Sequence, residues 1–247
     1  MMSNFVKQDD PAFLAFLEDA KKKEAAIDSF HAARIGNITG SGVGEIMGTP
    51  TAKSTYLYGK IAERMTGKPS PNFESQAMRE GKEKEAECCE LIKSIGFDLR
   101  FHTKDQITIT VGEKFVVTPD GFIFFGDGTK QSTETKCPTA PTHAKYLTEI
   151  KDFESLKKVN KNYYWQVVSQ MVSVFSHFYE MEFEEAIEKA KGSKGWFISY
   201  HPDFVKDKDR RLHCVEIAPP DKDFDELYTA VIGAVQEINE KIGYENK

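Results

Sequence analysis

The stretch TPDGFIFFGDGTKQSTETKC, residues 118 to 137, decides the fold because two runs typical of strands flank a turn within it. A Pro-Asp-Gly turn at residues 119–121 leads into the apolar run at residues 122–125. A Gly-Asp-Gly turn at residues 126–128 then reverses the chain, and residues 131–137 are typical of a returning strand. The stretch therefore predicts an antiparallel hairpin.

Three charged side chains of this hairpin are candidates for a catalytic site. Side chains alternate faces along a strand, so Glu134 and Lys136 point the same way, and the hairpin can bring Asp120 beside them. Two carboxylates suit a hard divalent cation such as Mg²⁺, which prefers oxygen ligands and keeps several waters. The lysine can then orient a nucleophilic water or stabilise charge on a phosphate. An ordinary hairpin with a solvated glutamate and lysine on its outer face explains the same spacing.

Length and composition limit the class of protein. The 247 residues are enough for one large domain with a sizeable core, and we expect a single domain over residues 1–247. Hydrophobic residues make up 40% of the chain, as in ordinary soluble proteins, and no apolar run approaches the length of a membrane span. The N-terminus lacks the residue order of a signal peptide, so we expect no membrane attachment and a cytoplasmic location.

Charge and cysteine content narrow the class further. The net charge of −6 argues against a protein that coats nucleic acid non-specifically, but it permits a nuclease whose metal-binding carboxylates add negative charge locally. Residues 143–161 are rich in lysine, which fits either a local basic path or a solvated face. The cysteines fit neither a disulfide framework nor a zinc-finger spacing, as is typical of a reducing compartment. They are Cys88, Cys89, Cys137 and Cys214.

Hydrophobic periodicity predicts the order of the elements. Helices are expected at residues 11–26, 42–47, 54–66, 75–95, 142–151, 160–178 and 223–242. Strands are expected at residues 99–102, 106–110, 114–117, 122–125 and 131–137, which form the core sheet, and at residues 195–201 and 212–217. This order, without repeats or an interdomain linker, predicts a mixed α/β (α+β) domain.

An anion site is one of two interpretations of the segment that contains Arg34 and Ser41. The short helix at residues 42–47 would offer backbone N–H groups to an anion, with Arg34 as a charged partner. Alternatively, Ser41 merely caps this helix and Arg34 pairs with a surface acid.

Two further groups of polar residues lie beside apolar helix faces. Glu85 is near the boundary between the charged and apolar faces of its helix, so it points either towards a site or into solvent. Asn162, Gln166 and Gln170 are spaced four apart and form one polar stripe. Such a stripe indicates contact with a polar group or with solvent.

Ordered motifs from residue 30 to about residue 202 resemble the lambda-exonuclease (YqaJ-type viral recombinase) family of the PD-(D/E)xK nuclease superfamily. The motifs are Phe30-His31-x-x-Arg34-x-Gly36-x-Ile38-Thr39-x-Ser41, Gly81-Lys82-x-x-Glu85, Pro119-Asp120-Gly121, Glu134-x-Lys136-Cys137-Pro138, Gln166-Val167 followed by Met171, and Phe197-x-Ser199-Tyr200-x-Pro202. Each motif alone is weak, but an ordered set of this length is a strong signal. The resemblance implies a restriction-endonuclease-like core with a central mixed sheet flanked by helices.

The resemblance also implies a catalytic metal centre. Asp120, Glu134 and Glu85 would hold Mg²⁺, with the main-chain carbonyl of Thr135 as a further ligand. Two ions are expected, with Mn²⁺ as an alternative metal. Lys136 would position the attacking water or stabilise the charge that develops on the phosphate.

A DNA-end pocket follows from the same resemblance. Arg34, Ser41, Thr118 and Gln166 would together bind a terminal 5′-phosphate. Met78, near the start of the helix that carries Glu85, would act as a wedge that parts the strands at the duplex end.

The implied function is a Mg²⁺-dependent exonuclease that resects linear double-stranded DNA from 5′ to 3′. The remaining 3′ single strand would serve a phage-type single-strand-annealing protein in recombination, within a bacterial host. Members of the family often form rings through which DNA threads, so a homo-oligomer, a trimeric ring, is expected.

Two other interpretations fit the same residues. One is another PD-(D/E)xK nuclease, either an endonuclease or a Cas4-like protein. Cas4-like proteins hold an iron–sulfur cluster with four cysteines, three of them near the C-terminus, whereas only Cys214 lies late in this chain. The other is a non-catalytic protein that binds DNA ends, although the joint presence of Asp120, Glu134 and Lys136 speaks against a decayed site.

Overall fold

The computed structural model describes residues 32–70, 76–206 and 210–243. The strands are β1 (Ile38–Thr39), β2 (Asp98–Arg100), β3 (Ile109–Gly112), β4 (Phe115–Val117), β5 (Gly121–Phe124), β6 (Lys130–Lys136), β7 (Gly195–Tyr200) and β8 (Leu212–Ile217). The helices are α2 (Val43–Ile46), α3 (Pro50–Thr66), α4 (Gln76–Ser94), α5 (Ala140–Glu149), α6 (Phe153–Val159), α7 (Lys161–Phe178), α8 (Phe183–Ala190) and α9 (Asp221–Ile242). Two short 3₁₀ helices, η1 (Gly40–Gly42) and η2 (Thr103–Asp105), complete the described elements.

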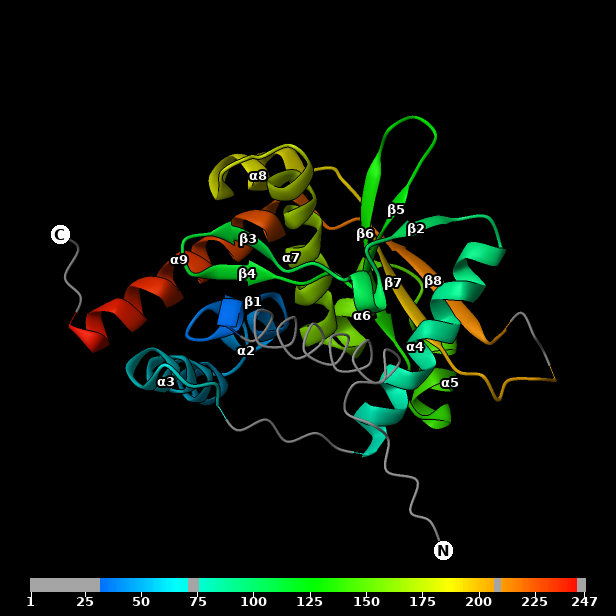
Figure 1. Ribbon diagram of the computed structural model, residues 1–247, viewed down its shortest axis with the longest axis horizontal. Helices are drawn as coiled ribbons and strands as arrows, with labels where there is room; N and C mark the ends of the chain where they lie inside the picture. Colours follow the sequence, from blue (N-terminus) through cyan, green and yellow to red (C-terminus); the bar gives the residue numbers. More distant parts are fainter. Residues whose placement is uncertain (1–31, 71–75, 207–209, 244–247) are drawn as a thin grey trace, which may run out of the picture.

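The larger sheet has five strands in the order β2-β5-β6-β7-β8. β5 and β6 form the predicted antiparallel hairpin, with Gly121 opposite Thr133. Its tip turns at Gly128, whose φ of +89° lies in the left-handed region that glycine tolerates. β7 pairs with β6 in parallel and β8 pairs with β7 in antiparallel fashion, so the sheet is mixed, as predicted. Figure 1 shows the β5–β6 hairpin projecting from this sheet.

A second sheet of three strands, in the order β1-β4-β3, corrects the prediction of one core sheet. β1 pairs in parallel with β4, with Ile38 opposite Phe115. A strand of two residues carries no periodicity, so the sequence could not indicate β1. The strand predicted at residues 106–110 runs instead from Ile109 to Gly112, after η2 and three residues without regular structure.

α7 lies between the two sheets and packs against both (Figure 1). Nearly all sides of this helix contact other elements, which explains why its apolar residues are not confined to one stripe. The fully buried apolar side chains are Tyr164, Trp165, Val167, Val168, Met171 and Val172. Ser169, Gln170 and Ser173 are buried in the same helix, so α7 also carries polar groups into the interior.

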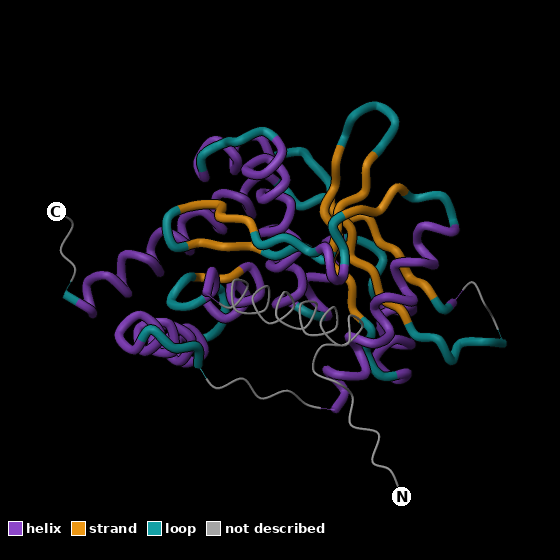
Figure 2. The backbone as a smooth tube through the Cα atoms, viewed as in Figure 1, coloured by secondary structure: helices purple, strands orange, loops and turns teal. Residues whose placement is uncertain are grey.

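Within the described residues, the predicted helices are present with shifted ends, and two helices, α6 and α8, were missed (Figure 2). α3 begins at Pro50, where the hydroxyl of Thr49 accepts the N–H of Ala52 and caps the helix. α6 was missed because it has only seven residues, although Asp152 and Ser155 form a capping box at its start. α8 was likewise missed, because its 8 residues make only about two turns. The helix predicted at residues 11–26 lies outside the described residues.

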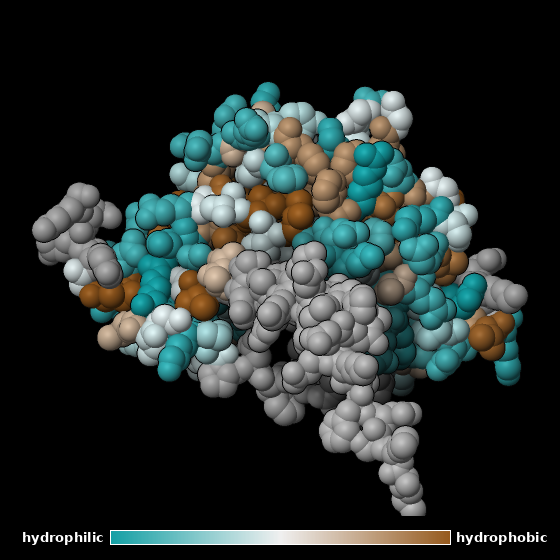
Figure 3. All heavy atoms as spheres, viewed as in Figure 1, coloured by the Kyte–Doolittle hydropathy of each residue, from teal (hydrophilic) through white to brown (hydrophobic). Residues whose placement is uncertain are grey.

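The described surface is largely hydrophilic on the face drawn in Figure 3, where brown side chains gather in patches near the middle. Among the helices that the structure describes, none is both long enough and apolar enough to cross a membrane.

Candidate active site

The ends of β5 and β6 bring the three charged residues of the hairpin together. The N–H of Asp120 donates to the Thr133 carbonyl at 3.1 Å, which extends the strand pairing by one residue beyond Gly121. The N–H of Thr135 then donates to Asp120 Oδ2 at 2.8 Å. Where β5 begins, the Asp120 carboxylate therefore takes the place of a strand carbonyl as the acceptor of the Thr135 N–H.

Glu134 and Lys136 lie on the same side of β6, as their spacing predicted, and they form an ion pair. The Glu134 side chain is completely buried, whereas the Lys136 side chain is 25% exposed. Gln170 of α7 donates to Glu134 Oε2. The Lys136 ammonium also lies 4.9 Å from the centre of the Tyr163 ring, in a cation–π contact.

Burial and mutual repulsion perturb both carboxylates. Burial, followed by the nearby charge of Asp120, raises the pKa of Glu134 to about 8. Burial also raises the pKa of Asp120, although Lys136 and the Thr135 N–H oppose the shift. Burial disfavours the ammonium of Lys136, but Glu134 and Asp120 outweigh it and raise the pKa of Lys136. Lys136 is therefore a fixed positive charge rather than a base in this arrangement.

These residues fit a divalent cation. Two carboxylates face one ammonium, so a second positive charge would relieve their repulsion. Glu134 Oε1 has no hydrogen-bond donor among the described residues apart from its ion pair with Lys136. The N–H and C=O of one strand residue face the same neighbour, so the Thr135 carbonyl faces the same edge as Asp120. The carboxylate oxygens and the Thr135 carbonyl oxygen are all hard ligand atoms, the kind that Mg²⁺ and Mn²⁺ prefer.

Glu85 lies half-buried on α4. The charges of Glu85 and Asp120 both act on the Cys89 thiol, so α4 passes close to the site. In the part of the chain that the structure describes, no group of three or more His, Cys, Asp or Glu is arranged to hold a metal. The role of Glu85 as a third metal ligand therefore stays a prediction.

The four cysteines gather in one small hydrophobic cluster with residues of α4, β2, β5, β7 and β8. A contact with Cys137, followed by burial, raises the pKa of Cys88, and burial raises the pKa values of Cys89 and Cys214 to about 12. These thiols are therefore neutral at physiological pH in the metal-free protein.

A second polar cluster, here called the hydroxyl cluster, comprises Arg34, Ser41, Thr118 and Thr108. Arg34 donates to Thr118 Oγ1 and to Ser41 Oγ, both at 3.3 Å. Thr108 Oγ1 lies 3.0 Å from Thr118 Oγ1. Burial lowers the pKa of Arg34, but a guanidinium starts so high that it stays charged. A cation with two hydroxyls is suited to bind a phosphate.

The pairing of β1 with β4 explains this cluster. Ile38 stands opposite Phe115 and Thr39 opposite Val116, an offset of 77 residues. Ser41 and Thr118 follow directly after these paired strands, in η1 and just after β4, and Arg34 donates a hydrogen bond to both.

The remaining predicted site residues are Gln166, on α7, and Met78, on α4. Asn162 and Ser169, at either end of two turns of α7, lie against Gly44 and Gly40 respectively. Gln166 falls on the same helix face by its spacing and is half-buried. The side chain of Met78 lies outside the described residues, as do Phe30 and His31 of the first motif.

Sequence reasoning missed several residues of the site. Gln106 donates to Asp120 Oδ1 and to the Pro119 carbonyl, both at 2.9 Å, and no local pattern marks it. Tyr163 was not singled out either. Gln170 was noticed only as a member of the amide stripe, which was the one available signal.

The protein has a restriction-endonuclease-like fold of the kind found in alkaline exonucleases. The structure is similar to the alkaline exonuclease LHK-Exo of Laribacter hongkongensis, with a TM-score of 0.67, 23% identity, and coverage of 88% of this chain and 95% of that chain. It is also similar to a phage-related exonuclease of Haemophilus somnus 129PT, with a TM-score of 0.55, 14% identity, and coverage of 83% and 94%.

The family follows from the sequence match. Residues 29–174 match the YqaJ-like viral recombinase domain, so the chain belongs to that family, which confirms the resemblance of its motifs. Comparison with curated proteins finds no significant match.

Proposed function

We propose that this protein is a divalent-metal-dependent exonuclease that degrades one strand of linear double-stranded DNA from a 5′-phosphorylated end. The observation that carries the proposal is the closeness of the two clusters. Thr118 precedes Asp120 by two residues, so their Cα atoms are at most about 7 Å apart. A terminal phosphate at Arg34 would then leave the next phosphodiester beside Asp120 and Glu134, one nucleotide along the strand.

The chemistry would divide between metal and protein. Cations held by Asp120, Glu134 and the Thr135 carbonyl would polarise the phosphodiester and lower the pKa of an attacking water. Glu85 is proposed as a further ligand from α4. Lys136, kept protonated by its carboxylate neighbours, would stabilise the negative charge that grows on the phosphate.

Gln170 and Gln106 would orient the two carboxylates. Each donates to one carboxylate oxygen and so restricts the rotation of that group. Gln166 would add an amide to the phosphate pocket, and Met78 would act as the strand wedge. Mg²⁺ is the proposed metal, two ions per site, with Mn²⁺ as an alternative.

The family supports the biological role. A viral recombinase domain fits an enzyme that leaves a 3′ single strand for an annealing protein in a bacterial cell. LHK-Exo was solved in complex with dAMP, a nucleoside monophosphate of the kind that this reaction would release. A closed trimeric ring would keep DNA attached to a subunit of net charge −6, because a topological link replaces electrostatic affinity.

The test is digestion of a linear duplex with one 5′-phosphorylated and one 5′-hydroxyl strand, in Mg²⁺ or in EDTA. Circular duplex serves as the control for endonuclease activity, and the Glu134→Gln protein runs alongside. We expect metal-dependent loss of the phosphorylated strand from its 5′ end, and no loss with the variant.

Other outcomes would change the assignment. Equal attack on both strands would keep a nuclease but remove the phosphate role of Arg34 and Ser41. Cleavage of the circle would indicate an endonuclease. No cleavage of either DNA with Mg²⁺ or Mn²⁺ would favour a protein that only binds DNA ends.

A further inference from the structure

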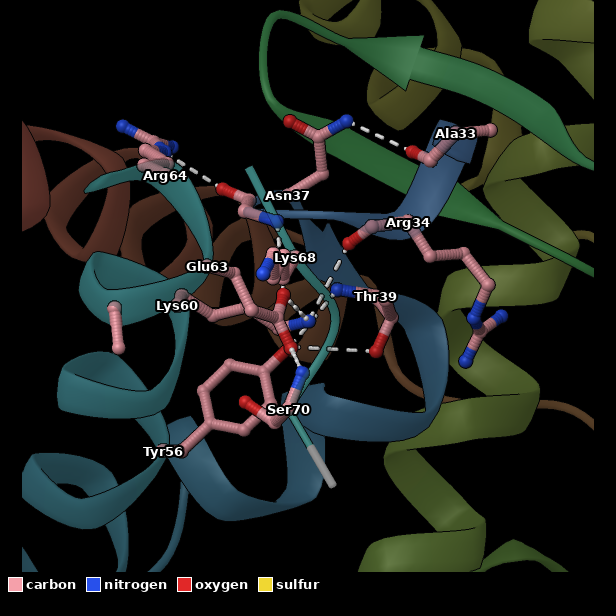
Figure 4. Close-up of polar contacts among 12 residues, drawn as sticks. Ala33, Arg34, Asn37, Thr39, Tyr56, Lys60, Glu63, Arg64, Lys68 and Ser70 are labelled. Atoms are coloured by element: carbon pink, nitrogen blue, oxygen red, sulfur yellow. Dashed lines mark hydrogen bonds and ion pairs between the residues drawn. The ribbon is translucent and has the colours of Figure 1, made fainter. Parts of the chain in front are cut away.

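Helix α3 contacts the segment of residues 36–42, which carries Ser41, through hydrogen bonds to two of its side chains. Figure 4 shows Tyr56 and Glu63 extending from α3 towards the chain around Arg34 and Thr39. Glu63, only 7% exposed, accepts the N–H of Gly36 at 2.8 Å. This contact fixes the left-handed turn at Gly36, whose φ is +66°. The start of the segment is therefore anchored to α3.

Tyr56 anchors the other end of the same segment. Its hydroxyl accepts the N–H of Thr39 at 3.0 Å. The phenol also lies directly on the backbone of Gly42, where an added Cβ would come within 2.1 Å of the Tyr56 hydroxyl oxygen. The ring and the segment thus fit together closely enough that residue 42 has room for glycine alone.

A row of hydroxyl groups leads from Tyr56 to the proposed phosphate pocket. Tyr56 Oη lies 3.3 Å from Thr39 Oγ1, and Thr39 Oγ1 lies 3.3 Å from Ser41 Oγ. Arg34 closes the row by donating to Ser41 Oγ. These contacts are long for hydrogen bonds between hydroxyls, but those of ligand-free sites commonly shorten when the ligand binds.

The donor and acceptor properties of these groups set the direction of the hydrogen bonds along this row. A guanidinium only donates, so Ser41 Oγ accepts from Arg34. The Tyr56 oxygen already accepts the Thr39 N–H, so its own proton is available to Thr39 Oγ1. Thr39 can then donate to Ser41, which leaves the Ser41 proton to point towards an anion. Burial raises the pKa of Tyr56, so the phenol keeps its proton at neutral and mildly alkaline pH.

We infer that Tyr56 is a positioning residue that sets the preference for a 5′-phosphate over a 5′-hydroxyl end. It acts through Thr39 by turning the exposed Ser41 hydroxyl so that it donates to the terminal phosphate. The inference rests on the proposed function, because it assumes that this phosphate binds at Arg34 and Ser41.

The test compares Tyr56→Phe with the wild-type protein on duplexes with a 5′-phosphate or a 5′-hydroxyl. Phenylalanine keeps the ring and removes only the hydroxyl. For the phosphorylated end we expect kcat/KM to fall about tenfold, mainly through KM, as for one lost hydrogen bond to a charged group. For the hydroxyl end kcat/KM should stay unchanged, so the preference falls by the same factor.

Two further variants sharpen the test. Thr39→Val removes the middle hydroxyl from a residue that is 4% exposed, and it should lower the preference in the same way. Tyr58→Phe is the matched control, because Tyr58 lies on the same helix, is 57% exposed, and its hydroxyl makes no hydrogen bond to a described residue. It should leave the preference unchanged.

The outcomes separate this inference from the proposed function. A wild-type protein that cleaves neither end would overturn both, and one that cleaves both ends equally would overturn the inference and the phosphate pocket but keep a nuclease. A wild-type protein that prefers the phosphate, with Tyr56→Phe and Thr39→Val slowing both substrates equally, would overturn the inference alone. Tyr56 would then only support the fold.

Discussion

Asp120 and Thr118 stand two residues apart, yet their surroundings differ in kind. Asp120 belongs to a cluster of charges, in which burial and Asp120 raise the pKa of Glu134 to about 8. Thr118 belongs to the hydroxyl cluster, where one guanidinium meets neutral groups that hydrogen-bond one another. The first cluster stores unfavourable electrostatic energy, whereas the second is largely satisfied within the protein.

The difference indicates how each cluster reaches its working geometry. A bound cation would relieve the repulsion between the two carboxylates and stabilise their positions. The geometry of the catalytic cluster therefore depends on the metal ion. Neutral hydroxyls exert no such force, and their positions follow from the backbone that carries them. The hydroxyl cluster therefore depends on α3 and on the pairing of β1 with β4. Substitutions in the two regions should consequently change different observables.

The largest effect should come from Asp120→Asn. We expect DNA cleavage in Mg²⁺ to fall by about 10²–10³-fold or more, because a metal ligand and its charge are lost. The metal-free protein should become more stable, because the variant removes the repulsion on Glu134. Urea unfolding in EDTA measures this change, with Asp98→Asn, an exposed aspartate paired with Arg100, as the control.

The pH dependence of that stability tests the cause. In the metal-free wild type, burial and the charge of Asp120 raise the pKa of Glu134 in the folded state to about 8, above the ordinary value of 4.5 that applies to the unfolded chain. The folded state then binds more protons, so the free energy of unfolding decreases as pH rises between these two values and levels off above. Asp120→Asn should flatten this slope. An unchanged slope would show that Asp120 does not repel Glu134.

The sequence predicted the charged cluster better than the hydroxyl cluster, for a physical reason. Glu134 and Lys136 are related by the two-residue repeat of a strand, and a short hairpin adds Asp120. These are local relations. Arg34 and Thr118 are 84 positions apart and meet only because β1, which has two residues, pairs with β4. No periodicity announces such a pairing, and only the family resemblance joined them.

The same distinction separates the two glutamines that hold the carboxylates. Gln170 belongs to a stripe with the period of a helix, so the sequence marked it, although not its partner Glu134. Gln106 lies in an extended segment after η2, where the predicted strand does not form. Its contact with Asp120 depends on how that segment folds over the hairpin, which no local pattern encodes.

An intermediate effect should come from Gln170→Leu. The variant keeps the volume of the buried side chain but removes the donor to Glu134. We expect the apparent affinity for Mg²⁺ to fall about 10–100-fold, because residues that orient metal ligands contribute that much. Cleavage rates over a range of Mg²⁺ concentrations measure it.

Gln131→Leu is the matched control for this change. Gln131 lies on β6, the strand that carries Glu134, but its side chain accepts from Trp196 Nε1 at 2.6 Å and not from a group of the catalytic cluster. It should alter stability without altering the Mg²⁺ requirement. A shift in the Mg²⁺ requirement of equal size in both variants would mean that Gln170 acts through general packing rather than by orienting Glu134.

The smallest effect should come from Glu63→Gln, in the region that supports the hydroxyl cluster. Glu63 accepts from Lys60 at 2.8 Å and from the N–H groups of Gly36 and Ser70. Burial opposes the charge, but these donors prevail and lower the pKa of Glu63. An amide keeps one acceptor oxygen and loses the ion pair, so we expect the free energy of unfolding to fall by about 1–3 kcal/mol.

Glu237→Gln gives the contrast that decides this last point. Glu237 pairs with Lys53 at 3.0 Å on the surface, where such pairs contribute roughly 0–1 kcal/mol. A clearly larger loss for Glu63→Gln, measured by urea unfolding, would show that the segment before Ser41 is held by a buried acceptor rather than by its own turn. Equal losses would mean that Gly36 keeps its conformation without Glu63. The hydroxyl cluster would then depend on the β1–β4 pairing and on Tyr56 alone.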